Sequence, residues 1–98
     1  MKDNSINQII QFLQKQIGSQ NLFIIDHWDA DRCAIGLTNQ SSQNLVYLST
    51  YNKKANECYV ELEIPGNNAK EYEVNGSFDN VNMAELEKIV RQHLGINS

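Results

Sequence analysis

The chain is poor in the residues that mark several large classes of protein. Its 98 residues include two cysteines and one proline, and Cys33 and Cys58 form neither a C-x-x-C pair nor a cluster with histidine. The pattern therefore suggests neither a disulfide scaffold nor a structural zinc site. Both cysteines fall on the inward side of predicted strands, so we expect two free thiols that pack as small hydrophobic side chains.

Long apolar runs and an excess of basic residues are also missing. No segment approaches the roughly 18 consecutive apolar residues that would span a bilayer, and the polar residues 1–4 precede no apolar signal core. Twelve acidic residues against eight basic ones give a net charge of −4, which disfavours binding to a phosphate backbone. We therefore expect a cytoplasmic protein that binds neither membranes nor nucleic acid.

The length and composition are those of one small globular domain. Ninety-eight residues suffice for a single hydrophobic core but not for two. Hydrophobic residues make up 41% of the chain and charged residues 20%, which is ordinary for folded material. No repeat, low-complexity tract or long linker divides the sequence, so we expect a single domain over residues 1–98.

Two segments have the apolar spacing of amphipathic helices. The first helix is predicted over 4–17, ends at Gly18 in a left-handed cap, and starts at a cap from Asp3, Asn4 or Ser5. Its apolar stripe is Ile6, Ile9, Ile10, Leu13 and Ile17, broadened by Phe12. The second helix is predicted from Met83 to Gly95, because Asn82 and Glu85 have the spacing of a capping box. Its stripe is Met83, Leu86, Ile89, Val90 and Leu94.

Five strands are predicted between the helices, over residues 22–25, 32–38, 45–51, 57–64 and 70–78, with a bulge at Gly76. Their short connections favour antiparallel neighbours. The two helices need an apolar surface on which to bury their stripes. We therefore predict an α+β fold of two layers, in which a five-stranded antiparallel meander carries the N- and C-terminal helices on one face.

The strand over 57–64 has the clearest pattern in the chain. Cys58, Val60, Leu62 and Ile64 alternate strictly with Glu57, Tyr59, Glu61 and Glu63, which is typical of a strand buried on one face only. On the remaining strands we predict the side chains of Arg32, Tyr47, Tyr51, Glu71 and Glu73 on the same open face, with Trp28 nearby. A row of carboxylates among tyrosines suits a positively charged protein partner better than a small substrate.

Catalytic and metal sites find little support in the sequence. Glu61 and Glu63 lie roughly 7 Å apart along their strand, but an acid/base pair would also need a walled cleft that raises one pKa. Asp26 and His27 are neighbours on a strand and point to opposite faces. Asp26, Asp29 and Asp31 lack the glycine and the distal glutamate of a calcium loop. We therefore predict no enzymatic activity, no cofactor and no metal.

The chain resembles a known family in the order of its segments. An amphipathic helix precedes Arg32-Cys33-Ala34-Ile35-Gly36-Leu37, then Tyr47-Leu48-Ser49-Thr50-Tyr51, then Glu57-Cys58-Tyr59-Val60-Glu61-Leu62-Glu63 and a closing helix. This order resembles small immunity proteins of bacterial polymorphic-toxin systems, in particular the TriTu-like group, over most of the chain. The resemblance implies an antitoxin that neutralises a cognate toxin domain inside the cell that makes it. Such antitoxins are often acidic and often cover a basic nuclease site.

Together these observations predict an immunity protein, monomeric or homodimeric, whose open sheet face occludes a toxin. The predicted partner-binding residues are Tyr47, Tyr51, Glu57, Tyr59, Glu61, Glu63, Glu71 and Glu73. One alternative is a homo-oligomeric module whose open face pairs with itself, although its carboxylates would then meet unless Arg32 and the Lys53-Lys54 turn offset them. Another is a small-ligand-binding or enzymatic domain, which would need a pocket that the sequence does not reveal.

Overall fold

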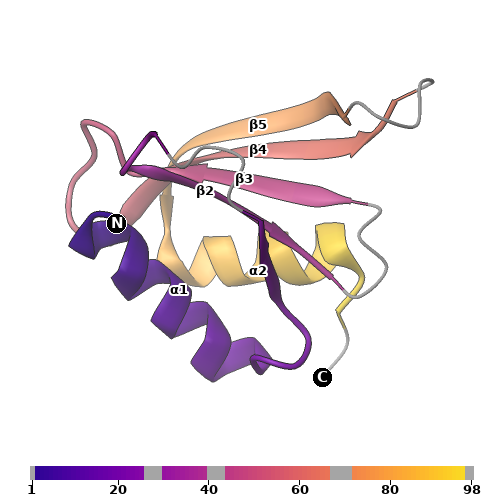
Figure 1. The fold of residues 1–98 in the computed structure, drawn as a ribbon, viewed down its shortest axis with the longest axis horizontal. Helices are drawn as coiled ribbons and strands as arrows, with labels where there is room; N and C mark the ends of the chain where they lie inside the picture. The colour runs from indigo at the N-terminus through magenta and orange to yellow at the C-terminus, as the bar shows by residue number, and fades with distance from the viewer. Residues whose placement is uncertain (1, 26–29, 40–43, 67–71, 97–98) are drawn as a thin grey trace.

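The computed structural model describes residues 2–25, 30–39, 44–66 and 72–96. Within these ranges the chain forms two helices and five strands. They are α1 (Asn4–Ile17), β1 (Phe23–Ile25), β2 (Ala34–Thr38), β3 (Leu45–Ser49), β4 (Glu57–Pro65), β5 (Tyr72–Asn82) and α2 (Met83–Leu94). The strands form one antiparallel sheet in the order β1-β2-β3-β4-β5, with α1 and α2 on the same side of it (Figure 1). The predicted α+β meander is confirmed.

The core lies between the sheet and the two helices. The predicted stripe of α1 is buried, as are Leu86, Val90 and Leu94 of α2, while Phe12, Met83 and Ile89 pack at the margin. The sheet contributes the inward side chains Ile35, Leu37, Val46, Leu48, Cys58 and Val60. Burial of apolar area at about 25 cal/mol per Å² is the main force that holds the helices on this face.

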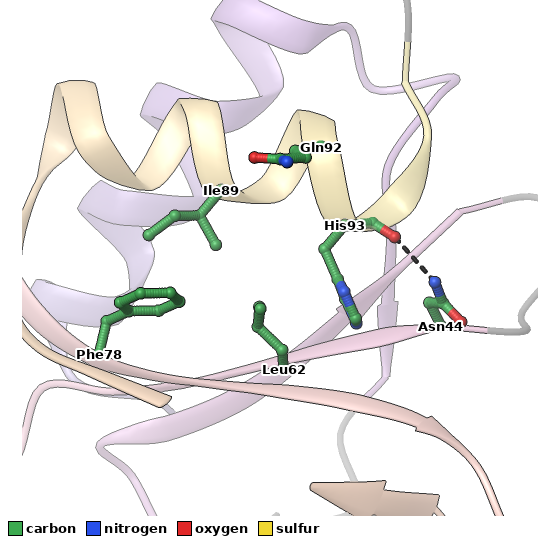
Figure 2. Close-up of a pocket in the computed structure, with 6 residues that line it drawn as sticks. All are labelled: Asn44, Leu62, Phe78, Ile89, Gln92 and His93. Atoms are coloured by element: carbon green, nitrogen blue, oxygen red, sulfur yellow. Dashed lines mark hydrogen bonds between the residues drawn. The ribbon is translucent and has the colours of Figure 1, made fainter. Parts of the chain in front are cut away.

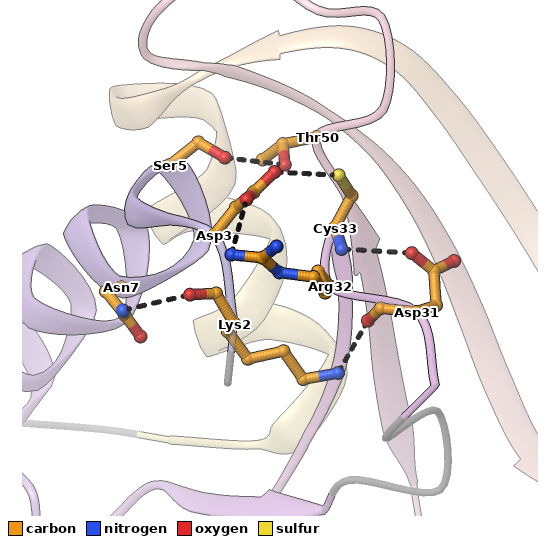
Figure 3. A network of polar contacts seen from close by, with 8 residues as sticks. All are labelled: Lys2, Asp3, Ser5, Asn7, Asp31, Arg32, Cys33 and Thr50. Carbon is orange, nitrogen blue, oxygen red and sulfur yellow. Dashed lines mark hydrogen bonds and ion pairs between the residues drawn. The ribbon is translucent and has the colours of Figure 1, made fainter.

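The helices begin and end where the sequence predicts, but only α2 has the predicted cap at both ends. Asn82 and Glu85 form the predicted capping box, and Gly95 adopts a left-handed conformation at φ 65°. Gly18 ends α1 at φ 100° and ψ 129°, which is a positive-φ end but not the predicted left-handed helical cap. Asp3 occupies the N-cap position of α1, but its side chain does not cap the helix. The Asp3 carboxylate instead accepts a hydrogen bond from the Cys33 thiol at 3.1 Å (Figure 3).

Strands β3 and β5 end at positions that differ from the prediction. β3 ends at Ser49, and Tyr51 lies in the following turn, where Asn52 and Asn56 adopt positive φ. β5 continues to Asn82 instead of ending near Phe78. Asp79 and Asn80 have the composition of a turn, but they form a bulge opposite β4 with Asn80 at φ 53°. The chain therefore passes from β5 into α2 without a loop.

A second bulge, at the predicted position of Gly76, changes which side chains of β5 face the helices. Leu62 pairs with Gly76, but Glu63 pairs with Val74, so β5 carries one extra residue there. Paired residues share a sheet face. Glu73 pairs with Ile64 and so lies on the side of the helices, whereas Val74 lies on the opposite face. The predicted placement of Glu73 on the open face is therefore wrong.

Strand β2 is buried on both faces, and the predicted placement of Arg32, which precedes it, was wrong. All five residues of β2 are buried, including Ala34, Gly36 and Thr38, which the register places on the face opposite the helices. Gly36 lies in the register between Ile25 and Tyr47, whose larger side chains flank it on both sides. Arg32 precedes β2 and does not lie on the open face. Its guanidinium lies 3.7 Å from the Asp3 carboxylate at the start of α1 (Figure 3).

Candidate functional site: the open face of the sheet

The sheet register arranges the side chains of the open face, opposite the helices, in rows across the strands. One row contains Ile25, Gly36, Tyr47, Glu61 and Ser77, and the next contains Phe23, Thr38, Leu45, Glu63 and Val74. Tyr59 pairs with Ser49 in a third row. Because β4 itself has no extra residue, Tyr59, Glu61 and Glu63 keep the strict alternation that the sequence predicts.

Two tyrosines from adjacent strands form the aromatic part of this face. The rings of Tyr47 and Tyr59 meet edge to face, with centroids 6.4 Å apart and planes at 73°, a favoured arrangement for aromatic pairs. Burial raises the pKa of Tyr47, and the charges of Asp31, Glu61 and Glu63 raise it further. Asp31 thus adds negative charge near this face. In the sequence, Asp31 had been considered only as part of a possible calcium loop.

Glu61 is held in place by the neighbouring tyrosine. The Tyr59 hydroxyl donates a hydrogen bond to Glu61 Oε2 at 2.7 Å. This bond to a charged acceptor favours the protonated phenol, and it is the main reason that the pKa of Tyr59 is raised. The short distance is typical of a charge-assisted bond, so one oxygen of Glu61 is fixed while the other can contact a partner.

Glu63 carries its charge in a less favourable place. It pairs across the sheet with Leu45, which is 1% exposed, and with Val74 on the other side. Burial raises the pKa of the Glu63 carboxyl, and the charge of Glu61 raises it further. The ion pairs found among the described residues are Arg32–Asp3, Lys53–Asp79 and Arg91–Glu87. None of them neutralises Glu61 or Glu63.

The structure brings together only part of the predicted site. Tyr47, Tyr59, Glu61 and Glu63 are neighbours, and we refer to these four residues as the acidic patch. Tyr51 lies outside the sheet and is 74% exposed. Glu57 begins β4 and also lines a hollow of about 280 Å³ beside the start of α1. Glu71 and Trp28 lie outside the described residues.

Exposed apolar side chains at the rim of the open face were missed by the sequence reasoning. Val74 on β5 is 59% exposed and Phe23 on β1 is 40% exposed, and both belong to the row that contains Glu63. The signal for Val74 is the bulge at Gly76, because one extra residue in β5 reverses the alternation before it and puts Val74 on this face. The open face therefore combines two tyrosines, exposed apolar side chains at its rim, and two carboxylates that no ion pair among the described residues neutralises.

The described residues offer little for chemistry at this face. They contain no group of three or more His, Cys, Asp or Glu side chains placed to hold a metal ion. The two thiols are free, but neither is activated. The hydrogen bond to Asp3 raises the pKa of Cys33, and burial raises the pKa of Cys58 to about 12. Both cysteines therefore stay protonated and are poor nucleophiles.

The comparisons with known proteins find nothing similar. No protein-family model matches the sequence, and neither a curated protein nor a solved structure does. In the described part of the chain, neither α1 nor α2 has the length and apolar character needed to cross a membrane.

Proposed function

We propose that the chain is an immunity protein, which binds a cognate toxin domain through the acidic patch and covers a basic site on it. The observation that carries this proposal is the pair of carboxylates of Glu61 and Glu63, which no described basic side chain neutralises. Desolvation and mutual repulsion of two like charges cost free energy in the isolated protein. A cationic partner would relieve the repulsion and would offset the desolvation by direct attraction, so the patch suits a positive surface.

The tyrosines supply the second requirement of such an interface. Tyrosine is enriched among residues that dominate binding energy, because its large rigid ring loses little entropy when it is buried. Tyr47 and Tyr59 already support each other, and Tyr59 already orients Glu61. Little of the binding free energy would therefore be spent on ordering these side chains. The proposed mechanism is occlusion in the cytoplasm, without catalysis.

Self-association through the open face is the weaker alternative. Two copies joined face to face by a two-fold axis would bring their acidic patches together. Two of the three basic side chains that might offset this repulsion are engaged elsewhere, since Arg32 lies beside Asp3 and Lys53 pairs with Asp79. We therefore assign the patch to a partner of opposite charge.

The test begins with the gene neighbourhood. The C-terminal domain of a large protein encoded beside this chain is expressed in a heterologous host with and without the chain, and growth and complex formation are followed. The proposal predicts toxicity of the domain alone, rescue by the chain, and a complex in size-exclusion chromatography that weakens as salt is raised. Unrelieved toxicity together with separate elution of the two proteins would contradict it.

A further inference from the structure

A hollow of about 340 Å³ lies on the helix side of the sheet, between α2 and the strands β4 and β5. It is lined by Asn44, Leu62, Phe78, Ile89, Gln92 and His93 (Figure 2). The apolar side chains of Leu62, Phe78 and Ile89 gather at one end, and Asn44 and His93 lie at the other. Its volume is at the lower end of the range for small-molecule sites, roughly 300–1,000 Å³. The acidic patch is on the opposite face of β4, so this hollow is a separate feature.

The polar end of the hollow is built from anchored groups. His93 Nε2 lies 2.9 Å from the backbone oxygen of Glu63, and Asn44 Nδ2 donates to the backbone oxygen of His93 at 2.9 Å. A further side-chain bond joins Asn39 Nδ2 to the backbone oxygen of Leu94. The last turn of α2 is thus tied to β4 and to the residues that flank the β2–β3 connection, so this wall of the hollow is formed before any ligand arrives.

These bonds determine which groups remain for a ligand. A carbonyl oxygen can only accept, so His93 Nε2 must donate to Glu63, and Nδ1 of the neutral ring is then an acceptor. His93 Nδ1 therefore remains an acceptor for a ligand, and no Asp, Glu, Lys or Arg side chain is among the residues that line the hollow.

We propose that this hollow is a binding site for a small neutral molecule that carries an apolar group, such as one aromatic ring, and one hydrogen-bond donor. The apolar group packs against Leu62, Phe78 and Ile89, and the donor binds Nδ1 of His93. A charged ligand would lose hydration without gaining an ion pair, so the uncharged lining selects against it. A ligand without a donor would displace water from this acceptor and leave it unpaired.

The test compares two probes that differ by one O-methyl group, which replaces the hydroxyl donor. Isotope-labelled protein is titrated with p-cresol and with 4-methylanisole, in which the same hydroxyl is methylated, and amide shifts are followed by nuclear magnetic resonance. We expect saturable shifts for p-cresol at residues 62, 78, 89, 92 and 93, and about tenfold weaker binding of 4-methylanisole, as expected for loss of one hydrogen bond. The comparison needs no variant and so does not depend on the folding of one.

A variant then assigns the donor contact. His93→Phe keeps a ring of similar size but removes the acceptor, so the preference for p-cresol over 4-methylanisole should shrink, whereas Lys88→Ala on the exposed part of α2 should leave it unchanged. Absence of saturable shifts with p-cresol up to its solubility limit would overturn the proposal. Equal affinities of the two probes for the wild-type protein would overturn it as well, because the polar end would then play no part in recognition.

Discussion

Tyr59 and Glu61 point to the same side of β4 and are joined by a hydrogen bond of 2.7 Å between Tyr59 Oη and Glu61 Oε2. The bond leaves Glu61 Oε1 without a partner among the described residues. It also links the aromatic part of the acidic patch to its charge, because the Tyr59 ring contacts Tyr47 on the neighbouring strand. Orientation of a carboxylate by a rigid aromatic neighbour is what a preformed binding surface for a cation requires.

The Tyr59–Glu61 bond predicts a change in the titration of Tyr59. Because this bond is the largest cause of the raised pKa of Tyr59, Glu61→Gln should lower that pKa toward the ordinary tyrosine value. The titration can be followed by tyrosinate absorbance, with Tyr59→Phe identifying the transition. Glu63→Gln removes the same charge without breaking the bond and is the matched control. An equal effect of both variants on Tyr59 would show that the hydrogen bond is not the main cause.

The raised pKa of Glu63 predicts that the stability of the protein depends on pH. This pKa is raised in the folded state by burial and by Glu61, so between the ordinary and the raised value the folded protein binds more protons than the unfolded chain. The free energy of unfolding must therefore fall as pH rises through that window. Glu63→Gln should be more stable than wild type at pH 7, and the difference should vanish below the ordinary value of 4.5.

Chemical denaturation at several pH values measures this effect. Glu73→Gln, on the other face of the hairpin, is the control, and we expect it to change stability by less than about 0.5 kcal/mol as an exposed substitution. A Glu63→Gln variant that is less stable than wild type at pH 7 would mean that the carboxylate makes a stabilising contact, and its availability for a partner would be in question.

The core and the hollow predict different costs for two leucine truncations. Leu48 is fully buried in the centre of the sheet, so Leu48→Ala should reduce the free energy of unfolding by about 2–5 kcal/mol. Leu62 lies at the margin of the core and lines the hollow. Truncation of the Leu62 side chain enlarges a space that is already open to solvent, so we expect a smaller loss of unfolding free energy for Leu62→Ala than for Leu48→Ala. Denaturant unfolding measures the free energy of unfolding of both variants. A larger decrease for Leu62→Ala than for Leu48→Ala would contradict the described packing.

The raised pKa values of the two cysteines predict that the native protein is alkylated slowly. Cys58 is fully buried with a pKa raised to about 12, and the pKa of Cys33 is raised by its hydrogen bond to Asp3. Iodoacetamide should therefore modify both residues slowly near neutral pH, and Cys58 should react at an appreciable rate only in denaturant. Asp3→Asn should speed the reaction of Cys33 but not of Cys58. Peptide mass spectrometry after timed quenching measures each site, and rapid native modification of Cys58 would contradict its burial.

The parts of the fold that the sequence predicts are those governed by local periodicity. The stripes of α1 and α2 and the alternation over β4 depend on spacing along one segment, so the faces of Tyr59, Glu61 and Glu63 were predicted correctly. The capping box at Asn82 is likewise a local pattern. These features need no knowledge of which strands are neighbours.

The errors arise where one residue or a distant segment changes the outcome. The single extra residue at Gly76 reverses the alternation before it, which moves Glu73 to the helix side. Burial of β2 on both faces depends on its neighbours Ile25 and Tyr47 in the sheet. The hollow could not be predicted, because Phe78 and Ile89 become its walls only after α2 packs on the sheet.

The affinity of charge-reversed variants for the toxin domain that we propose as partner tests the role of the acidic patch most directly. Glu61→Lys and Glu63→Lys are compared with Glu73→Lys, which makes the same change in charge on the other face of the β4–β5 hairpin. Like charges at an interface cost several kcal/mol, and each 1.4 kcal/mol is about tenfold in affinity. Calorimetry should therefore show losses of about 100-fold or more for the first two variants and little change for Glu73→Lys, with melting temperatures near wild type. Wild-type affinity in the double variant Glu61→Lys/Glu63→Lys, or an equal loss with Glu73→Lys, would remove the acidic patch from the mechanism.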